Sequence, residues 1–434
     1  MSWIHAVADR APDRVAIEGL ERSLTYAELR DAAVAGAGGL DGVRRVAIAL
    51  PPGEDFVVAV HACLLAGAAA VPIDLRLSDA ERGRRLAGTE VTIDKPLPGA
   101  LPPPASLAGQ PARLDTGGHP GSDRAEDVPV AVIHTSGTTA SPKPVVLTAG
   151  NFLASALGSA VALGLDPAER WLCPMPLTHV GGLSIPIRSA IYATTAVVHG
   201  RFDTEAVLSE LADPGRRITL VSLVPTMLAR LLDAGLQRPP TLRWALLGGG
   251  PIAPALLERA RAAGVPVAPT YGMTEACSQI ATFGWPLAGV EVRTDEDGEV
   301  LVRGPIVSPG AVASDGWLHT GDLGRFAERN RLEIVGRKAD TIITGGENVA
   351  PTEVEAALLE HPAVADAAVH PRADPEWGEA VIATVVLREG ASAPPEELRA
   401  HCAARLAAFK VPKAVEFADA LPRTQSGKLL RRQL

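Results

Sequence analysis

The stretch VPVAVIHTSGTTASPK, residues 128–143, decides the fold, because an apolar run there leads directly into a loop of hydroxyl and glycine residues. Residues 128–133 predict a buried strand, since a short apolar run bounded by turn residues is typical of one. The loop at 135–143 combines hydroxyls, backbone amides and one lysine. Such donors surround phosphate oxygens at small desolvation cost, so the stretch predicts an anion-binding loop at the end of a strand.

Two alternatives bear on this loop. It is not a P-loop, because the pattern GxxxxGK[ST] is absent. Taken alone, a cluster of Ser, Thr and Gly is also typical of a solvated turn. The interpretation as a phosphate site therefore depends on the motifs elsewhere in the chain.

Further apolar runs alternate with helical stretches on both sides of residues 128–143. This alternation predicts βαβ units with mostly parallel sheets, and therefore an α/β fold. Beyond the turn Asp297-Gly298 the strands become short, and beyond 336 a smaller α+β segment follows. We expect a large N-terminal domain of βα layers at residues 1–337 and a small α+β C-terminal domain at 338–434. The strands and helix predicted outside the opening stretch are 46–50, 69–73, 218–223, 244–248, 265–267, 299–303, 332–335 and 381–387, with a helix at 351–360; residues 96–128 are expected to be a surface linker.

Length and composition exclude several classes of protein. A chain of 434 residues exceeds the size of a single core, which predicts at least two domains. The composition is globular, and no apolar run is long enough to span a membrane. The start lacks a secretory signal, so the expected location is the cytoplasm. Four scattered cysteines argue against a disulfide framework or structural zinc, and a net charge of -9 argues against a general nucleic-acid binder.

A second motif reads TYGMTE at residues 270–275, with GGGP upstream at 248–251. Glycines let a backbone lie against a flat base, Tyr271 can stack on that base, and a carboxylate beside phosphates can hold magnesium. Alone, GGGP is merely a turn. Similarly, Glu275 alone would be a solvated carboxylate at the start of a helix.

A third motif pairs WLHTGD at residues 317–322 with GRKAD at 336–340. A carboxylate such as Asp322 can accept hydrogen bonds from both ribose hydroxyls, and a nearby arginine such as Arg337 can donate to them. The alternative is a salt-bridged hairpin. A fourth motif, PRTQSGK at 422–428, ends on Lys428, which by itself would be a solvated lysine of the tail.

These four motifs, in this order, resemble those of the adenylate-forming superfamily of acyl-CoA synthetases, peptide-synthetase adenylation domains and luciferases, over nearly the whole chain. The resemblance implies that ATP and Mg²⁺ convert a carboxylic acid into an acyl-adenylate, whose acyl group then passes to the thiol of coenzyme A. It also implies a mobile C-terminal domain. The chain departs from the usual motifs at Ala140 and Pro144, which replace glycines, and at Ala339, the hinge position.

The resemblance assigns a role to each matching residue. Lys428, Thr274, Glu275 and His179 are catalytic: Lys428 stabilises negative charge on the attacking carboxylate and the α-phosphate, Thr274 contacts that phosphate, and Glu275 is the metal ligand. The nucleotide-binding residues implied are Thr135, Ser136, Gly137, Thr138, Thr139, Lys143, Gly249, Gly250, Tyr271, Gly272, Met273, Thr274, Asp322, Arg337 and Lys428.

The acid pocket is indicated by PLTHVGGLS at residues 176–184, which resembles the superfamily motif whose histidine, here His179, lies near the substrate carboxylate. A histidine in an apolar run is more often a satisfied core residue. Downstream, Arg188 stands in an apolar stretch and needs a carboxylate, either structural or on the substrate.

A second carboxylate on the acid would explain Arg188. Within the superfamily, residues 246–251 and 271–280 most resemble the o-succinylbenzoate–CoA ligases of menaquinone synthesis. That resemblance implies that Gly181 and Gly182 make room for an aromatic ring, and that Ser278 and Thr274 border the acid.

The coenzyme A step is assigned to ITGGENV at residues 343–349, where Gly345 and Gly346 would let pantetheine pass close to the backbone. The alternative is a β-turn before the next helix. Other functions also remain open: another aryl- or fatty-acyl-CoA ligase, a stand-alone enzyme loading a carrier protein, or a catalytically idle ATP-binding homologue with a regulatory role. We expect small-molecule partners, namely the acid and coenzyme A, and no nucleic acid; whether the chain forms a homo-oligomer stays open.

Overall fold

The computed structural model describes residues 3–19, 21–97, 125–135, 143–423 and 429–434. Most of the linker expected at 96–128 thus lies outside the described residues, and near its end residues 125–127 form the 3-10 turn η1 (Ala125–Asp127). Within the described ranges, no helix is long and apolar enough to cross a membrane. The strands found there form two large, mostly parallel sheets, one antiparallel sheet and a C-terminal sheet, which confirms the predicted α/β class.

The first sheet contains the strand that opens the sequence motif. Its strands lie in the order β5 (Val91–Ile93), β3 (Arg45–Ile48), β4 (Ala69–Pro72), β6 (Pro129–Thr135) and β7 (Lys143–Thr148). All neighbours are parallel except β6 and β7. Helices α3 (Glu54–Ala66) and α4 (Asp79–Leu86) connect the parallel strands, as a βαβ pattern requires.

The second sheet carries most of the βα units. Its order is β14 (Trp285–Pro286), β13 (Ser278–Thr282), β12 (Val267–Met273), β11 (Trp244–Leu247), β10 (Leu220–Leu223), β8 (Arg170–Cys173), β9 (Thr195–Val198), β1 (Val15–Glu18) and β2 (Ser23–Thr25). The pairs from β12 to β1 are parallel, and the pairs β14–β13, β13–β12 and β1–β2 toward the two ends of the sheet are antiparallel. The connecting helices are α6 (Val180–Tyr192), α7 (Thr204–Ala212), α8 (Pro225–Asp233) and α9 (Pro254–Ala262).

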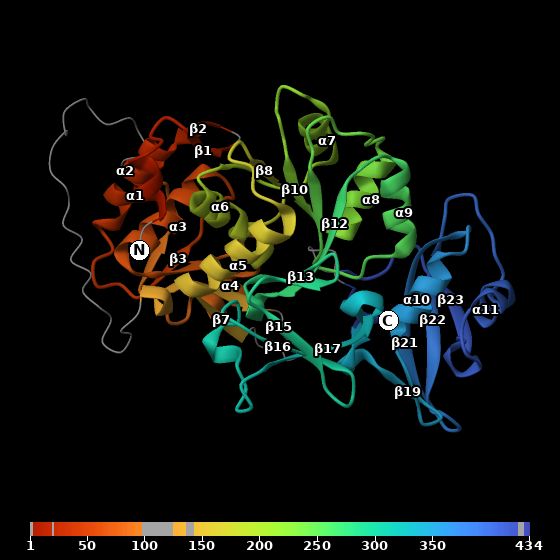
Figure 1. The fold of residues 1–434 in the computed structure, drawn as a ribbon. Coiled ribbons are helices and arrows are strands. Elements are labelled where there is room, and N and C mark those ends of the chain that lie inside the picture. The colour runs from red at the N-terminus through yellow and green to blue at the C-terminus, as the bar shows by residue number, and fades with distance from the viewer. Residues whose placement is uncertain (1–2, 20, 98–124, 136–142, 424–428) are drawn as a thin grey trace.

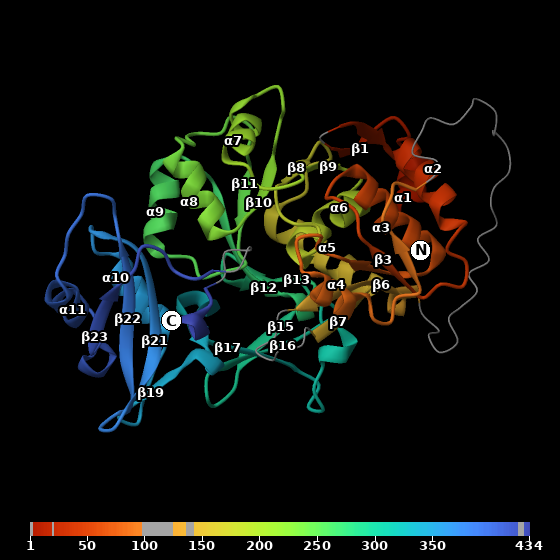
Figure 2. The ribbon, with the colours of Figure 1, turned by 180° about the vertical axis from the view of Figure 1, so that it is seen from behind.

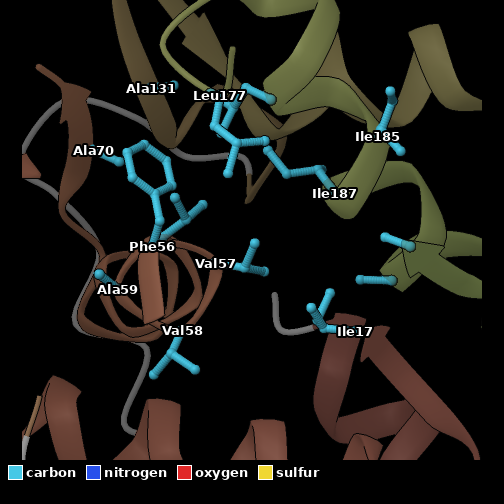
Figure 3. Packing of buried hydrophobic residues seen from close by; sticks show 14 of the residues in the cluster. Ile17, Phe56, Val57, Val58, Ala59, Ala70, Ala131, Leu177, Ile185 and Ile187 are labelled. Carbon is cyan, nitrogen blue, oxygen red and sulfur yellow. The ribbon is translucent and has the colours of Figure 1, made fainter. Parts of the chain in front are cut away.

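The main core lies between these two sheets, around α3 and α6. In Figure 3, Phe56 and Val57 of α3 pack close to Ala70 of the first sheet, Ile17 of the second and Ile187 of α6. Helices α1 (Trp3–Ala8), α2 (Tyr26–Ala37) and α5 (Ala149–Leu163) also contribute buried residues to this core. Because α3 and α6 are covered on both sides, their sequences are apolar nearly all round rather than on one stripe.

The third sheet is wholly antiparallel and consists of β15 (Glu291–Thr294), β16 (Glu299–Arg303), β17 (Leu318–Ala327) and β18 (Arg331–Arg337). A short 3-10 turn, η5 (Lys338–Asp340), then leads into the C-terminal part. That part contains β20 (Glu347–Val349), β19 (Ile342–Thr344), β22 (Gly378–Leu387), β21 (Val364–Asp374) and β23 (Ala414–Phe417), with α10 (Pro351–Leu359) and α11 (Pro395–Ala403).

The C-terminal part forms a separate blue body beside the rest of the chain in both views (Figures 1 and 2). It has its own hydrophobic core, whose buried residues all come from position 342 onward. The boundary expected at 337/338 falls between the last strand of the third sheet and the first strand of this body. The helix predicted at 351–360 is α10, and the strand predicted at 381–387 is part of β22.

Candidate active site

Tyr271, Asp322 and Arg337 meet at one point of the fold. Strands β17 and β18 run antiparallel with Asp322 directly opposite Arg337. Arg337 Nε lies 2.8 Å from Asp322 Oδ1, and the Tyr271 phenol donates a 2.8 Å hydrogen bond to Oδ2. Burial and the adjacent Asp322 charge raise the pKa of Tyr271, so its phenol stays protonated as a donor. The predicted ribose-binding pair is thus in contact, and the ion pair expected of a salt-bridged hairpin is present as well.

Gly249 and Gly250 lie just beyond the carboxyl end of strand β11, which pairs with β12. Gly249 has a φ of +78°, a conformation that favours glycine. Gly250 is different, because a Cβ there would meet nothing closer than Pro225 Cδ at 3.9 Å. Packing within the chain does not require Gly250, which leaves its surface open to a ligand.

Gly272 lies within β12 and has a structural reason of its own. A Cβ at this position would lie 1.6 Å from the carbonyl oxygen of Ser278 on β13. The register between β12 and β13 shifts at Tyr271/Gly272, which brings the two backbones this close. Met273 ends the strand and carries the chain into η2 (Thr274–Ala276).

Thr274 and Glu275 occupy this short turn directly after β12 and are half-buried. Backbone contacts fix the turn: Cys277 N donates to Thr274 O at 3.1 Å, and Ser308 N donates to Glu275 O at 2.8 Å. Among the described residues no group of three or more acidic, His or Cys side chains forms a metal cluster. Glu275 therefore fits Mg²⁺ only in the manner of a single carboxylate that shares the ion with substrate phosphates, which is common for this metal.

The anion-binding loop connects two paired strands. Thr135 ends β6 and Lys143 begins β7, opposite each other in antiparallel register. The Thr135 hydroxyl donates to the Lys143 carbonyl at 3.3 Å. Ser136, Gly137, Thr138 and Thr139 lie outside the described residues, as does the departure at Ala140. The described ends place the loop at the carboxyl end of β6, where an α/β sheet presents ligand sites.

His179 lies at the N-cap of α6 and is exposed. Desolvation by the surrounding protein lowers its pKa; the charge of Asp74 opposes this shift, and Arg76 and Arg85 add to it. The imidazole is therefore mainly neutral at neutral pH. In this neutral state His179 is better suited to hydrogen-bond an acid than to act as a fixed positive charge beside it.

Gly181 and Gly182 open α6, and the chain itself fills the space beside them. A Cβ at Gly182 would lie 2.3 Å from Pro176 O, and one at Gly181 would lie 3.0 Å from Met175 Cε. Gly182 is thus needed for close packing of α6 against the preceding turn. This geometry does not support the expectation that Gly182 makes room for an aromatic ring.

Arg188 is fully buried in α6, with 1% of its surface exposed. Its Nη2 donates to Ser155 Oγ on α5 at 2.8 Å, and its guanidinium lies 5.8 Å from the ring centre of Trp171. Desolvation lowers the pKa of Arg188, although no shift of this kind removes the charge of an arginine at neutral pH. Among the described residues no carboxylate pairs with it, and its Nε has no hydrogen-bond partner.

Ser155 was not predicted from the sequence, although it links Arg188 of α6 to the backbone that follows η2. Its hydroxyl accepts from Arg188 and donates to Cys277 O at 2.7 Å, beside Ser278. A capping box between Thr148 and Asn151 begins α5, and the Asn151 side chain also bonds Pro305 O and Val307 O. No sequence signal marks Ser155, because a serine within a helix pattern usually faces solvent or its own backbone.

Gly345 and Gly346 form the two-residue turn between β19 and β20. Their φ angles are +59° and +84°, which is the type I′ hairpin geometry that favours glycine at both positions. The predicted β-turn is therefore present, and the coenzyme A role remains a prediction. Lys428 lies outside the described residues, whereas Arg423 and Leu429 on either side of its segment are paired in an antiparallel bridge.

Comparison with known families gives two matches along the chain. Residues 4–311 match the AMP-binding enzyme family, and residues 353–428 match the AMP-binding enzyme C-terminal domain. A 2-succinylbenzoate–CoA ligase from Bacillus licheniformis is 38% identical over 481 aligned residues, covering 100% of this chain and 99% of the relative.

Solved structures are similar over the same extent. The o-succinylbenzoate coenzyme A synthetase of Bacillus subtilis in complex with its acyl-adenylate intermediate has a TM-score of 0.85 at 34% identity, covering 100% of this chain and 97% of that one. A double mutant of the same synthetase, bound to a product analogue, scores 0.68 at the same identity and coverage. The described arrangement therefore resembles the acyl-adenylate complex more than the product-analogue complex.

Proposed function

Because this chain belongs to the AMP-binding enzyme family, we propose that it is an o-succinylbenzoate–CoA ligase, acting in menaquinone biosynthesis. In the first half-reaction a carboxylate oxygen attacks the α-phosphorus of ATP, and the bond to pyrophosphate breaks. In the second, the sulfur of coenzyme A attacks the acyl carbon, the bond to AMP breaks, and the thiol proton is released. ATP and coenzyme A are thus substrates, and Mg²⁺ is the resident metal.

The nucleotide site is built around Asp322. Its carboxylate accepts the ribose hydroxyls while Arg337 and Tyr271 hold it in place. The aromatic ring of Tyr271 stacks on the adenine, and the open surface at Gly250 lets the base approach the backbone. Thr135 and Lys143, together with the residues between them, hold the phosphates.

The phosphate end of the site is completed by Thr274 and Glu275 directly after β12. Mg²⁺, when bound, neutralises phosphate charge, and Glu275 is the side chain that would hold it. Lys428 supplies a second positive charge from the C-terminal domain. Adenylation needs mainly positioning and charge neutralisation, so these groups suffice without a general base.

Arg188 recognises the acid, and the assignment of the substrate rests on this residue. A buried guanidinium without a carboxylate partner is costly, and a carboxylate from the ligand would offset that cost. o-Succinylbenzoate has two carboxylates, so one can react while the other pairs with Arg188. His179 at the start of α6 and Ser278 beside Cys277 border the same acid.

One assay tests this function. Purified protein is incubated with ATP, Mg²⁺, coenzyme A and each acid of a panel containing o-succinylbenzoate, benzoate and a fatty acid, and AMP and thioester are quantified. We expect thioester from o-succinylbenzoate at a kcat/KM at least about 100-fold above the other acids, as the loss of one buried ion pair predicts. Equal rates on benzoate would refute the substrate assignment.

The same assay, together with a pyrophosphate-exchange measurement, separates the alternatives. Acyl-adenylate without thioester, in the presence of coenzyme A, would instead indicate an enzyme that loads a carrier protein. Carboxylate-dependent pyrophosphate exchange would be absent from a catalytically idle homologue. Thioester, acyl-adenylate alone, and no exchange are three different results, so the two measurements together distinguish the three functions.

A further inference from the structure

The outer face of α5 differs from the outer faces of the other surface helices, because it carries no charged side chain. Residues 144–165, which contain the whole helix, include no Asp, Glu, Lys or Arg. Helices α2, α4, α7, α8, α9, α10 and α11 each carry acidic or basic side chains. A helix that meets solvent normally places its charges on the outer face, so α5 is not built for solvent alone.

Large apolar side chains project from this face. Leu157 and Val161, one helical turn apart, are 55% and 73% exposed, and Leu165 just beyond the end of the helix is 50% exposed. Trp285 of β14 is 46% exposed. Helix α5 lies beside β13, the strand that pairs with β14, in both views (Figures 1 and 2). We call these four side chains the α5 patch.

A hollow of about 190 Å³ opens within the α5 patch. Gly158, Val161 and Ala162 of α5 line one side of it, and residues between 282 and 288 line the other. None of the side chains that line it is charged. An apolar cavity of about 150 Å³ is large enough for benzene, so this hollow can accept one apolar side chain from another molecule.

The patch is complementary to a second copy of itself. Leu157 and Val161 form a ridge of residues four apart, and two such ridges interdigitate in the commonest class of helix packing. A two-fold axis that crosses α5 between these residues places Leu157 against the partner's Val161, and Val161 against the partner's Leu157. The half-exposed Ala154 and Ala160 on the same side are small enough to let the two helices approach closely.

The size of the patch also fits a homodimer. Its four side chains expose on the order of 400 Å² of apolar surface. A standard interface covers about 800 Å² on each partner, and about 65% of it is apolar in homodimers, so the patch supplies most of the apolar part. A lipid surface fits less well, because helices that lie on membranes carry Lys or Arg beside their apolar face, and residues 144–165 have neither.

We propose that the α5 patch is the interface of a homodimer, in which α5 packs against α5 of a second copy across a two-fold axis. This inference goes beyond the ligase function and does not depend on it, since no residue of the patch belongs to the nucleotide or acid site. Each chain has a net charge of -9, so two copies repel each other at long range. A contact face without charges adds no further repulsion to that.

Sedimentation velocity of the full chain between about 1 and 100 µM tests the dimer. We expect the wild type to reach twice the 45.0 kDa mass of one chain within this range. Val161→Glu should raise the dissociation constant at least about 30-fold, because it buries an unpaired charge on each side of the axis. Val34→Glu is the matched control: Val34 is 45% exposed on α2, outside the patch, and its replacement should leave the dissociation constant unchanged.

A mixing experiment tests the two-fold geometry. Leu157→Lys alone should weaken the dimer as Val161→Glu does. In an equimolar mixture of the two variants the new ammonium and carboxylate meet across the axis, so the dissociation constant should return to within about 5-fold of wild type. This recovery also shows that both variants are folded, since an unfolded chain cannot restore the dimer of its partner.

Four results would overturn the proposal. They are a wild type that stays monomeric up to the highest concentration, a dimer that Val161→Glu leaves intact, assemblies larger than a dimer, and a mixture of folded variants that stays monomeric. Circular dichroism establishes that each variant is folded; if one is not, Leu157→Ser and Val161→Ser replace the charged variants and should each weaken the dimer about 10-fold. A monomeric wild type that instead binds phosphatidylglycerol vesicles would assign the patch to a lipid surface.

Discussion

The phenol of Tyr271 donates a 2.8 Å hydrogen bond to Asp322, although the two residues lie on different sheets. Arg337 occupies the other oxygen of the same carboxylate. In the proposed site, the Tyr271 side chain thus combines an aromatic face for the base with a donor that orients Asp322. In the proposed nucleotide site, this bond couples the part that holds the adenine to the part that holds the ribose.

Replacing Tyr271 by Phe keeps the ring and removes the donor. A hydrogen bond to a charged group contributes about 1.5–3 kcal/mol, so we expect the KM for ATP to rise about 10-fold with kcat little changed. The rise should be smaller with 2′-deoxy-ATP, which lacks one of the hydroxyls that Asp322 would accept. Steady-state kinetics with both nucleotides measure this.

Tyr26→Phe is the control for that experiment. Tyr26 is also buried, and its hydroxyl donates to Ser189 O at 2.8 Å and Thr194 O at 2.7 Å, within the core. Its loss should lower stability and leave the KM for ATP unchanged. Equal KM values for wild type and Tyr271→Phe would show that the phenol does not orient Asp322.

Replacing Arg188 by Met should separate substrate binding from stability. Because Arg188 is buried and no carboxylate among the described residues pairs with it, its removal relieves a desolvation cost rather than leaving a charge unpaired. We expect the KM for o-succinylbenzoate to rise at least about 30-fold, the KM for ATP to stay constant, and the free energy of unfolding to change by less than about 1 kcal/mol.

Arg243→Met is the matched comparison for stability. Arg243 pairs at 2.8 Å with Glu169, whose side chain is 1% exposed, so its removal strands a buried carboxylate. That variant should lose about 3–5 kcal/mol in urea unfolding. A similar loss in Arg188→Met would mean that Arg188 serves the fold and not the acid.

Gly272 and Gly250 make a second contrasting pair. Gly272→Ala places a Cβ 1.6 Å from Ser278 O, so the β12–β13 pairing must move. We expect a loss of at least about 3 kcal/mol in unfolding free energy. Gly250→Ala meets only ordinary contacts and should change stability by less than about 1 kcal/mol, while raising the KM for ATP if the base lies there. Equal destabilisation by the two substitutions would contradict the assignment.

Glu210 predicts a pH dependence of stability. Burial raises the pKa of its carboxyl, but hydrogen bonds from His199 and Arg216 outweigh this and lower it from 4.5 to about 2. A carboxyl whose pKa is lower in the folded state stabilises the fold above its unfolded pKa, and this contribution is lost as the pH falls through the folded pKa. The contribution is therefore complete above about pH 4.5 and fades toward pH 2.

Glu210→Gln should accordingly cost about 2 kcal/mol at neutral pH and progressively less as the pH approaches 3. Urea unfolding of wild type and variant across this range gives the difference directly. The exposed Glu258→Gln serves as control and should show no such convergence. A constant difference across the range would mean that the titration of Glu210 does not contribute.

Much of the fold followed from local patterns. The strand at 128–133, the helix at 351–360 and the α/β class were predicted from hydrophobic periodicity, which reports on neighbours in sequence. Asp322 and Arg337 were predicted as a pair, and they meet because β17 and β18 are consecutive antiparallel strands. A resemblance in four ordered motifs supplied the family, which the comparisons confirm.

The sequence by itself thus determined the α/β class, the order of the motifs and the chemistry that those motifs carry. Only the tertiary structure decided that Tyr271 bonds Asp322, that Ser155 rather than a carboxylate meets Arg188, and that Arg431 reaches Asp340. It also decided that Pro176 fills the space beside Gly182. The physical reason is that periodicity fixes which face of an element is buried, whereas the partner of a buried polar group depends on how distant elements pack.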